Sequence, residues 1–250
     1  MKKIFILTSL FLFMCSSISA QDRNKYILDV IEYERELNDL VLRVIDSLGG
    51  KANNLQYKSY QSNGEIVYQN GEKALFDLFY LEKDWARLEQ KKEAEYVLFG
   101  SHGRRGWKRL LAEKGTTEET LKGTELAEEY QFNIYENNLF DYDKQRLEIY
   151  YEGEVLFGDI EAYIIRLAGF SYGEEMYYIS KKTYRPIMKQ VYIFHRRSQS
   201  VINYTIKDYI KIQGVLLPKL VGIEKNGSTK MMEFYTYDFS TKFDKNFFKN

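Results

Sequence analysis

Cysteine, proline and histidine are all scarce in this chain. Its 250 residues include 1 Cys, 2 Pro and 2 His. A single cysteine cannot form a disulfide within the chain, and it rules out sites with several thiolate ligands. His102 and His195 both fall in predicted turns, so a Ser-His-Asp triad or a multi-histidine metal site would have almost no residues to use.

Other catalytic signatures are also missing. The segment at residues 100–103, Gly-Ser-His-Gly, lacks the spacing and the Lys-Ser/Thr ending of a phosphate-binding loop. No Gly-x-Ser-x-Gly nucleophile motif occurs. The 36 acidic residues leave open a pair of carboxylates at glycosidase separation. We expect a protein that is not an enzyme and uses neither a metal nor a cofactor.

No apolar run is long enough to cross a bilayer as a helix, which takes about 20 residues. The longest run, residues 4–14, follows Lys2 and Lys3 and precedes small residues that end at Ala20. This is the pattern of a cleaved secretory signal, so we expect a periplasmic or cell-envelope protein whose mature chain starts near residue 21. Cys15 raises the alternative of a lipoprotein, but Met14 stands where such a signal has a small residue.

Charge and aromatic content narrow the choice further. Loss of Lys2 and Lys3 from 36 basic residues leaves two fewer than the 36 acidic ones, so no global field attracts nucleic acid. Aromatic residues make up 16% of the chain, with 22 Tyr and 16 Phe, which favours strands. A chain of this length buries enough surface to fold without a disulfide. We expect one mostly β domain over residues 21–250.

The pattern of apolar residues predicts a helix followed by many strands. Apolar residues at a spacing of three and four predict a helix over residues 24–48, and Gly49-Gly50 ends it. From Leu55 the period becomes two, and Asn70-Gly71 predicts a tight hairpin. Short connections predict antiparallel pairing in a meander. The later strands are expected at residues 85–90, 96–99, 107–111, 147–151, 160–168, 175–179, 187–194, 201–212, 215–224 and 230–239.

One helix is expected between the two runs of strands, at about residues 116–139. Thr116 and Glu119 fit a capping box, and Leu126, Tyr130 and Ile134 recur at a spacing of four. Several later strands carry bulky apolar residues on both sides, as in residues 160–168. Both faces of the sheet are therefore expected to be covered, one by helices and the other by curvature of the sheet or an apolar ligand.

The order of these landmarks resembles the LolA-like family of periplasmic lipoprotein carriers, also called outer-membrane lipoprotein-sorting proteins. The resemblance covers most of the mature chain. It rests on Gly49-Gly50 before a strand with Ser59 and Gly64, a glycine turn at 100–106 before Trp107, a helix near 124–138, Gly158, Tyr177-Tyr178-Ile179, Thr183-Tyr184, Asp208-Tyr209 and residues 214–218. It implies an unclosed, curved antiparallel half-barrel whose apolar concave face is partly covered by helices and shelters acyl chains.

Six apolar side chains are candidates for lining such a cavity. They are Phe79, Trp85, Phe99, Trp107, Tyr163 and Ile165. Aromatic rings present a large apolar area at a low entropic cost, although ordinary packing in the sheet core explains the two tryptophans equally simply.

Four arginines in predicted turns are candidates for the rim of the cavity. They are Arg104, Arg105, Arg196 and Arg197. A meander could place them together, where they would bind anionic lipid head groups or an acidic partner protein of the envelope. The alternative is that they are solvated hairpin tips.

Two functions fit these observations. The first is a non-enzymatic carrier or binder of lipid or lipoprotein acyl chains, with an envelope membrane protein as a further partner. The second is an envelope structural or interaction protein whose half-barrel is filled by its own side chains. The two differ in whether the concave face is open or packed.

Overall fold

The computed structural model describes residues 20–56, 59–81, 85–93, 95–102, 105–129 and 138–249, without the side chains of residues 20–31 and 55–56. Two compact units divide the chain, Met1–Leu42 and Arg43–Asn250, and the second contains every described strand. The single domain expected over residues 21–250 stays a prediction. The export signal and Cys15 lie outside the described residues, except for Ala20, where the first helix begins.

The predicted N-terminal helix and its glycine stop are confirmed. Helix α2 (Ala20–Ser47) is followed by Gly49 and Gly50 at φ values of 109° and 83°, which glycine adopts at little cost. A Cβ atom at Gly49 would lie 2.3 Å from the carbonyl oxygen of Gly214, so only glycine fits there. The short helix α3 (Lys51–Gln56) follows.

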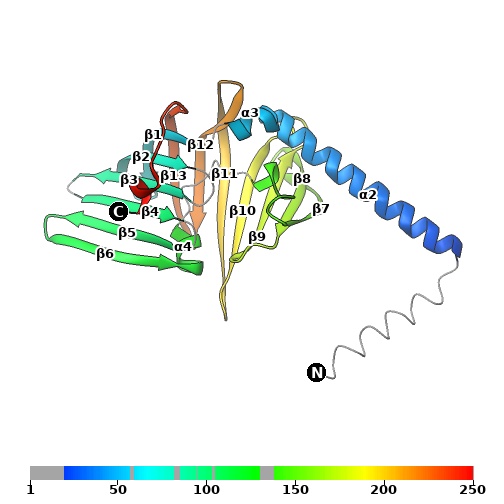
Figure 1. The fold of residues 1–250 in the computed structure, drawn as a ribbon, viewed down its shortest axis with the longest axis horizontal. Coiled ribbons are helices and arrows are strands. Elements are labelled where there is room, and N and C mark those ends of the chain that lie inside the picture. Colours follow the sequence, from blue (N-terminus) through cyan, green and yellow to red (C-terminus); the bar gives the residue numbers. More distant parts are fainter. Residues whose placement is uncertain are drawn as a thin grey trace. The chain divides into compact units, whose positions relative to one another are not determined.

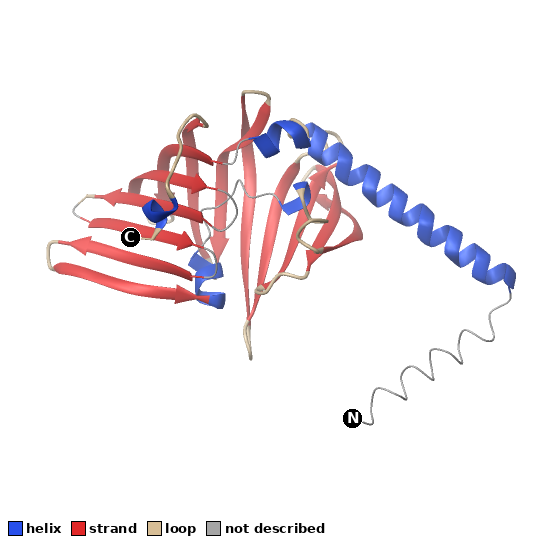
Figure 2. Cartoon of the chain, in the orientation of Figure 1, coloured by secondary structure: helices blue, strands red, loops and turns tan. Residues whose placement is uncertain are grey.

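Thirteen strands form one antiparallel sheet in the part of the chain that the structure describes (Figure 2). The first meander contains β1 (Ser59–Tyr68), β2 (Lys73–Leu81), β3 (Trp85–Lys92), β4 (Glu95–His102), β5 (Arg105–Ala112) and β6 (Gly115–Lys122). The second contains β7 (Glu148–Phe157), β8 (Ile160–Ala168), β9 (Gly173–Ser180), β10 (Pro186–Phe194), β11 (Gln199–Ile212), β12 (Val215–Lys225) and β13 (Ser228–Asp238).

The two meanders are joined where β1 pairs with β13, so the spatial order runs from β6 through β1, β13 and on to β7. Strands β6 and β7 are the two edges and do not pair with each other in this order. Figure 1 shows that the sheet is strongly curved. The predicted mostly β fold, a curved antiparallel sheet that stays open, with an N-terminal and an inserted helix, is confirmed.

The inserted helix starts later than the sequence pattern predicts. Residues 115–122 form the edge strand β6, and helix α4 spans only Gly123–Glu129. The capping box at Thr116 and Glu119 is therefore wrong, because both residues pair with β5. The remainder of the predicted helix, residues 130–137, lies outside the described residues. A short 3-10 helix, η1 (Asn138–Phe140), comes next.

The predicted turn at residues 100–106 is also shorter than expected. Gly100 lies in β4 and Gly106 in β5, and the two strands pair as far as His102 and Arg105. A Cβ atom at Gly100 would lie 2.3 Å from the indole of Trp107. This glycine therefore makes room for a ring on the neighbouring strand rather than for a bend in the chain.

Alternation along the strands gives the sheet two faces, and one of them, the inner face, carries the main core. Cross-strand pairing places Ile66, Met232 and Val221 in one row of this face. Ile223, Tyr204, Lys189, Tyr177 and Ile165 form the next row. Apolar residues from β1–β4 and from β10–β13 form a single buried cluster, so the curvature brings strands from both meanders around one core.

The opposite, outer face is covered unevenly. A short 3-10 helix near the C-terminus, η2 (Lys245–Phe248), packs against β3 and β4 there. On β8 the outer face carries Ile160, Ala162 and Ile164, of which Ala162 is buried and Ile160 is 43% exposed. The expectation that both faces of this strand are covered is therefore wrong at Ile160.

Candidate functional site

Helix α4 lies over the inner face and bridges the two meanders. It contacts β5 and β6 on one side and β10 on the other (Figure 1). Leu126 reaches the backbone of Gly106 so closely that a Cβ atom there would lie 2.4 Å from its Cδ1 atom. Leu126 and Ala127 pack against the inner-face cluster, but no residue of α4 is fully buried. The helix is therefore a cover with only shallow apolar contacts.

Ionic contacts at the end of α4 hold it to the second meander. The Glu128 carboxylate accepts hydrogen bonds of 2.7 Å from the Ser200 hydroxyl and 2.8 Å from the Lys225 ammonium, and lies 2.9 Å from Nε2 of His195. Burial would raise the pKa of Glu128, but the hydrogen bonds from Lys225 and Ser200 hold it below its usual value. Glu128 is therefore ionised at neutral pH and fixes α4 to β11 and β12.

A second ionic contact ties α4 to the first meander. Glu129 accepts a hydrogen bond of 3.1 Å from the ammonium of Lys108 on β5. The side chains of both partners are 38% exposed, so the pair contributes little to stability. Both ionic contacts therefore lie at the C-terminal end of α4, one to each meander.

Farther along the sheet, a polar cluster fills the inner face between β9 and η1. The Glu175 carboxylate is buried and accepts hydrogen bonds of 2.9 Å from Asn138 and 2.6 Å from the Tyr177 hydroxyl. Lys189 lies 3.3 Å away and Tyr172 donates at 3.0 Å. Burial opposes ionisation, but the charge of Lys189 and these hydrogen bonds hold the pKa of Glu175 below its usual value.

Three of the six predicted cavity residues lie on the inner face. Phe99 and Ile165 are buried there, on β4 and β8. Tyr163 lies on the same face of β8 and is half-buried, with its ring 6.3 Å from that of Tyr184. Phe99 belongs to the main apolar cluster of the inner face.

The other three predicted residues, Phe79, Trp85 and Trp107, lie on the outer face. Residues of the C-terminal segment cover all of them: the Phe79 ring lies 5.0 Å from that of Phe247, and the Trp107 indole donates a 2.9 Å hydrogen bond to the Phe248 carbonyl. The six residues therefore do not line one surface. Phe79 points away because its neighbours Leu78 and Tyr80 take the inner face.

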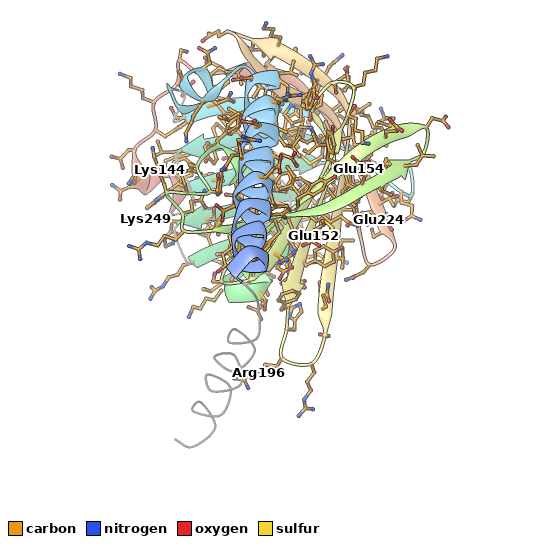
Figure 3. All side chains as sticks on the ribbon, turned by 90° about the vertical axis from the view of Figure 1, so that its right-hand side faces the viewer. Lys144, Glu152, Glu154, Arg196, Glu224 and Lys249 are labelled. Carbon is orange, nitrogen blue, oxygen red and sulfur yellow. The ribbon has the colours of Figure 1, made fainter. Side chains whose placement is uncertain are left out.

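The described rim arginines lie beside residues that contact α4 from the first and from the second meander. Arg105 starts β5 beside Gly106, which Leu126 contacts, and Arg196 and Arg197 follow His195, which Glu128 contacts. All three arginines are exposed, and Figure 3 shows Arg196 at the end of the long β10–β11 hairpin. Arg104 lies outside the described residues.

Within the described part of the chain, no group of three or more His, Cys, Asp or Glu side chains is placed to hold a metal ion. None of the described helices combines the length and the apolar character that a membrane span needs.

Sequence reasoning missed the polar groups of the inner face. Glu175 and Lys189 each interrupt an otherwise apolar strand pattern, and a charged residue in such a position is the signal that could have revealed them. Glu128 offered no such signal, because it lies in a run of charged residues that looks solvated.

No protein-family model matches this sequence, and no curated protein matches it at a significant level. Solved structures do. A DUF1329 family protein from Desulfovibrio piger has a TM-score of 0.54 and 12% identity, over 85% of this chain and 96% of that one. A LolA superfamily protein from Nitrosomonas europaea has a TM-score of 0.53 and 10% identity, over 82% and 95%.

A putative outer-membrane lipoprotein-sorting protein domain from Vibrio parahaemolyticus is similar too, with a TM-score of 0.51 and 13% identity over 79% of this chain and 92% of that one. At these identities the likeness concerns the fold alone. The fold of this chain is thus LolA-like, as the sequence landmarks predict.

Proposed function

We propose that this protein is an exported, non-enzymatic binder or carrier of lipid or lipoprotein acyl chains, which lie on the inner face beneath α4. The observation that carries this proposal is the contrast between that face and its cover. The face is one apolar cluster spanning both meanders, whereas α4 has no fully buried residue and is fixed by ionic contacts at Glu128 and Glu129.

The free energy of burial favours replacing the contacts of α4 at the inner face by an acyl chain. Each methylene of an acyl chain that leaves water for an apolar surface contributes about 0.8 kcal/mol. Moving α4 exposes the partly buried Leu126 and Ala127 together with the cluster residues beneath them, which an acyl chain would cover again, and the ion pairs of α4 gain water. A chain of about ten methylenes would therefore outweigh the contacts of α4 at the inner face.

The likeness in fold supports the proposal. The similar Vibrio parahaemolyticus domain is described as a putative outer membrane lipoprotein-sorting protein domain. The signal-like residues 1–20 of this chain would direct it to export. Mass spectrometry of the protein recovered from the envelope tests export: a mature chain starting near residue 21 supports it, and an intact Met1 contradicts it.

Bound lipid is the direct test of the carrier. The protein should be purified without detergent and analysed by native mass spectrometry, followed by displacement of a fluorescent fatty acid. We expect a bound lipid mass and displacement by a lipoprotein. The absence of both would refute the proposal.

A matched pair of bulky substitutions locates the bound chain. Leu110 is half-buried on the inner face of β5, opposite Val97, whereas Leu75 is 58% exposed on the outer face of β2. Leu110→Trp should fill the site and reduce fatty-acid binding at least tenfold, while Leu75→Trp should leave it unchanged. Equal effects of the two substitutions would contradict binding on the inner face.

A structural or interaction protein is the second candidate, and the cluster around Glu175 favours it. Asn138, Leu139 and Phe140 of η1 are all buried against this part of the inner face, so the protein's own side chains fill it. If the same holds beneath α4, no alkyl chain enters. A crystal structure without a cavity under α4, together with no bound lipid, would favour this candidate.

The arginine turns complete the proposal. We infer that Arg105, Arg196 and Arg197, with Arg104, meet anionic head groups or an acidic envelope partner while cargo enters beneath α4. Their position beside residues that contact that helix supports this role.

A further inference from the structure

Lys230 lies on the inner face near the start of β13, where β1 ends. Its cross-strand partner on β12 is Ile223 and that on β1 is Tyr68, so its side chain emerges on the same face as the apolar cluster. Next along the strand on this face is Met232, which is fully buried. Burial lowers the pKa of Lys230, and the nearby charges of Lys225 and Lys108 lower it further, against the opposing effect of Glu129.

The carboxylates near Lys230 are already engaged with other groups. Glu129 is hydrogen-bonded to Lys108, and Glu128 to Lys225 and Ser200. Among the described residues, no carboxylate lies within ion-pair distance of Lys230. Three amino groups therefore share two carboxylates under α4, and the described part of the chain supplies no third carboxylate for Lys230.

A desolvated cation without a counterion is unfavourable, and an anion brought to it gains more than it would at an exposed lysine. On the inner face, the amino group of Lys230 lies beside a row of apolar residues. Along β13, Lys230 is followed on this face by Met232 and Phe234, and Ile66 lies opposite Met232. The arrangement matches a ligand with an anionic head and an apolar tail.

We propose that Lys230, assisted by Lys108 and Lys225, binds the anionic head group, a carboxylate or a phosphate, of the amphiphile whose chain lies on the inner face. The head lies under the end of α4 and the tail runs over Met232 and Ile66 toward β2. This inference rests on the proposed function and names the class of its ligand. A long side chain with a mobile ammonium suits head groups of either shape.

The test compares three probes that share one tail: dodecanoate, dodecyl phosphate and uncharged dodecanol. Their affinities are measured by calorimetry for the wild type, Lys230→Met and Lys207→Met. Lys207 is the matched control, an exposed lysine of β11 whose side chain lies beside Gly222 on the outer face. Lys230→Arg serves as a second variant that keeps the charge.

We expect the wild type and Lys207→Met to prefer both anions over dodecanol by roughly tenfold or more, as for other charge-assisted hydrogen bonds. Lys230→Met should lose this preference and still bind dodecanol, and Lys230→Arg should keep most of it. A preference for anions that survives in Lys230→Met would overturn the inference while the proposed function stands. Failure of all three probes to bind the wild type would overturn both.

A control with inorganic phosphate distinguishes a site for the head group of an amphiphile from a site for a free anion. At millimolar concentration, without an alkyl chain, it should not change the melting temperature of the wild type by more than it changes that of Lys230→Met. A stabilisation by phosphate alone that disappears in Lys230→Met would assign the site to a free anion and overturn the amphiphile.

Discussion

The sheet has two covers, and they are built differently. On the outer face, the C-terminal segment packs Phe247 and Phe248 onto Phe79 and Trp85, and Phe248 is fully buried. Two of its carbonyls also accept hydrogen bonds, at 2.9 Å from the Trp107 indole and at 3.0 Å from Arg87. On the inner face, α4 has no buried residue and depends on Glu128 and Glu129.

The difference is the reason why we expect a ligand on the inner face. An aromatic cover with hydrogen-bonded carbonyls is part of the core, because lifting it would expose large rings and leave buried polar groups unpaired. A short helix held by partly exposed ion pairs exchanges those contacts for water at little cost. Trp85 and Trp107 pack against the C-terminal segment. We therefore expect a ligand to enter at the inner face, when α4 moves, rather than at these tryptophans.

The outer cover should be the most sensitive to substitution. Phe248→Ala removes a fully buried ring, and we expect a loss of about 4 kcal/mol in the free energy of unfolding, measured with denaturant. Phe194→Ala is the control, since that ring is 49% exposed, and should change stability by less than about 0.5 kcal/mol. Similar small effects of both would show that the C-terminal segment is no part of the core.

The second largest loss of stability is expected at the buried Glu175. Glu175→Gln leaves Lys189 without its charged partner, and we expect a loss of about 3 kcal/mol at neutral pH. Because the folded state lowers the pKa of Glu175, its contribution is present above the ordinary carboxyl range and is lost as the pH falls through the lowered pKa.

The Gln variant should therefore lose less stability than the wild type when the pH falls below the ordinary carboxyl range. Glu174→Gln, on the same strand but 32% exposed, is the control. If the difference between wild type and Glu175→Gln is independent of pH down to strong acid, the assigned role of this carboxylate is wrong.

A substitution in α4 should change the release rate of a bound fatty acid more than it changes the stability of the protein. Glu128→Gln weakens the contacts of α4 with Lys225 and His195, and we expect a loss of about 1 kcal/mol. Release of a bound fluorescent fatty acid should accelerate, because α4 opens more often. Glu125→Gln, an exposed position on α4, should do neither. A release rate that is unchanged in Glu128→Gln would mean that α4 is not the cover that moves.

The smallest change in stability is expected at the arginine turns. Replacing Arg104, Arg105, Arg196 and Arg197 by Gln should alter stability by less than about 0.5 kcal/mol. Binding to anionic vesicles should weaken strongly at low salt, by about 1 kcal/mol per charge, and little at high salt, where screening removes the attraction. Neutral vesicles are the control. Unaltered binding to anionic vesicles at low salt would make these arginines solvated hairpin tips.

Local signals predicted most of the fold. The glycine pair after α2, the hairpin at Asn70-Gly71 and the alternation over β8 each act over a few residues, and the structure has β8 at the predicted bounds, Ile160–Ala168. Strand β6 was predicted as a helix because Thr and Glu, which occupy its exposed positions, are also typical of a helix start. Its pairing with β5 decides the outcome, as is usual for a polar edge strand.

The candidate site was less accessible from the sequence. Alternation shows that Phe79 and Leu78 point to opposite faces, but not which face is covered by a segment more than 160 residues away. The C-terminal phenylalanines settle that question for Trp85 and Trp107. The surroundings of Glu175 and Lys230 likewise depend on tertiary contacts, because Asn138 of η1 reaches Glu175 and Tyr68 of β1 lies opposite Lys230.

Photo-crosslinking tests the central claim most directly. A fatty acid with a diazirine near the end of its chain is bound to the protein, activated by light, and its attachment sites are mapped by peptide mass spectrometry. We expect attachment to inner-face residues of β1–β5 and β12–β13 and to α4, and none to residues 243–248. Attachment to the C-terminal segment or to Trp85 and Trp107, or no attachment at all, would contradict an acyl-chain site on the inner face.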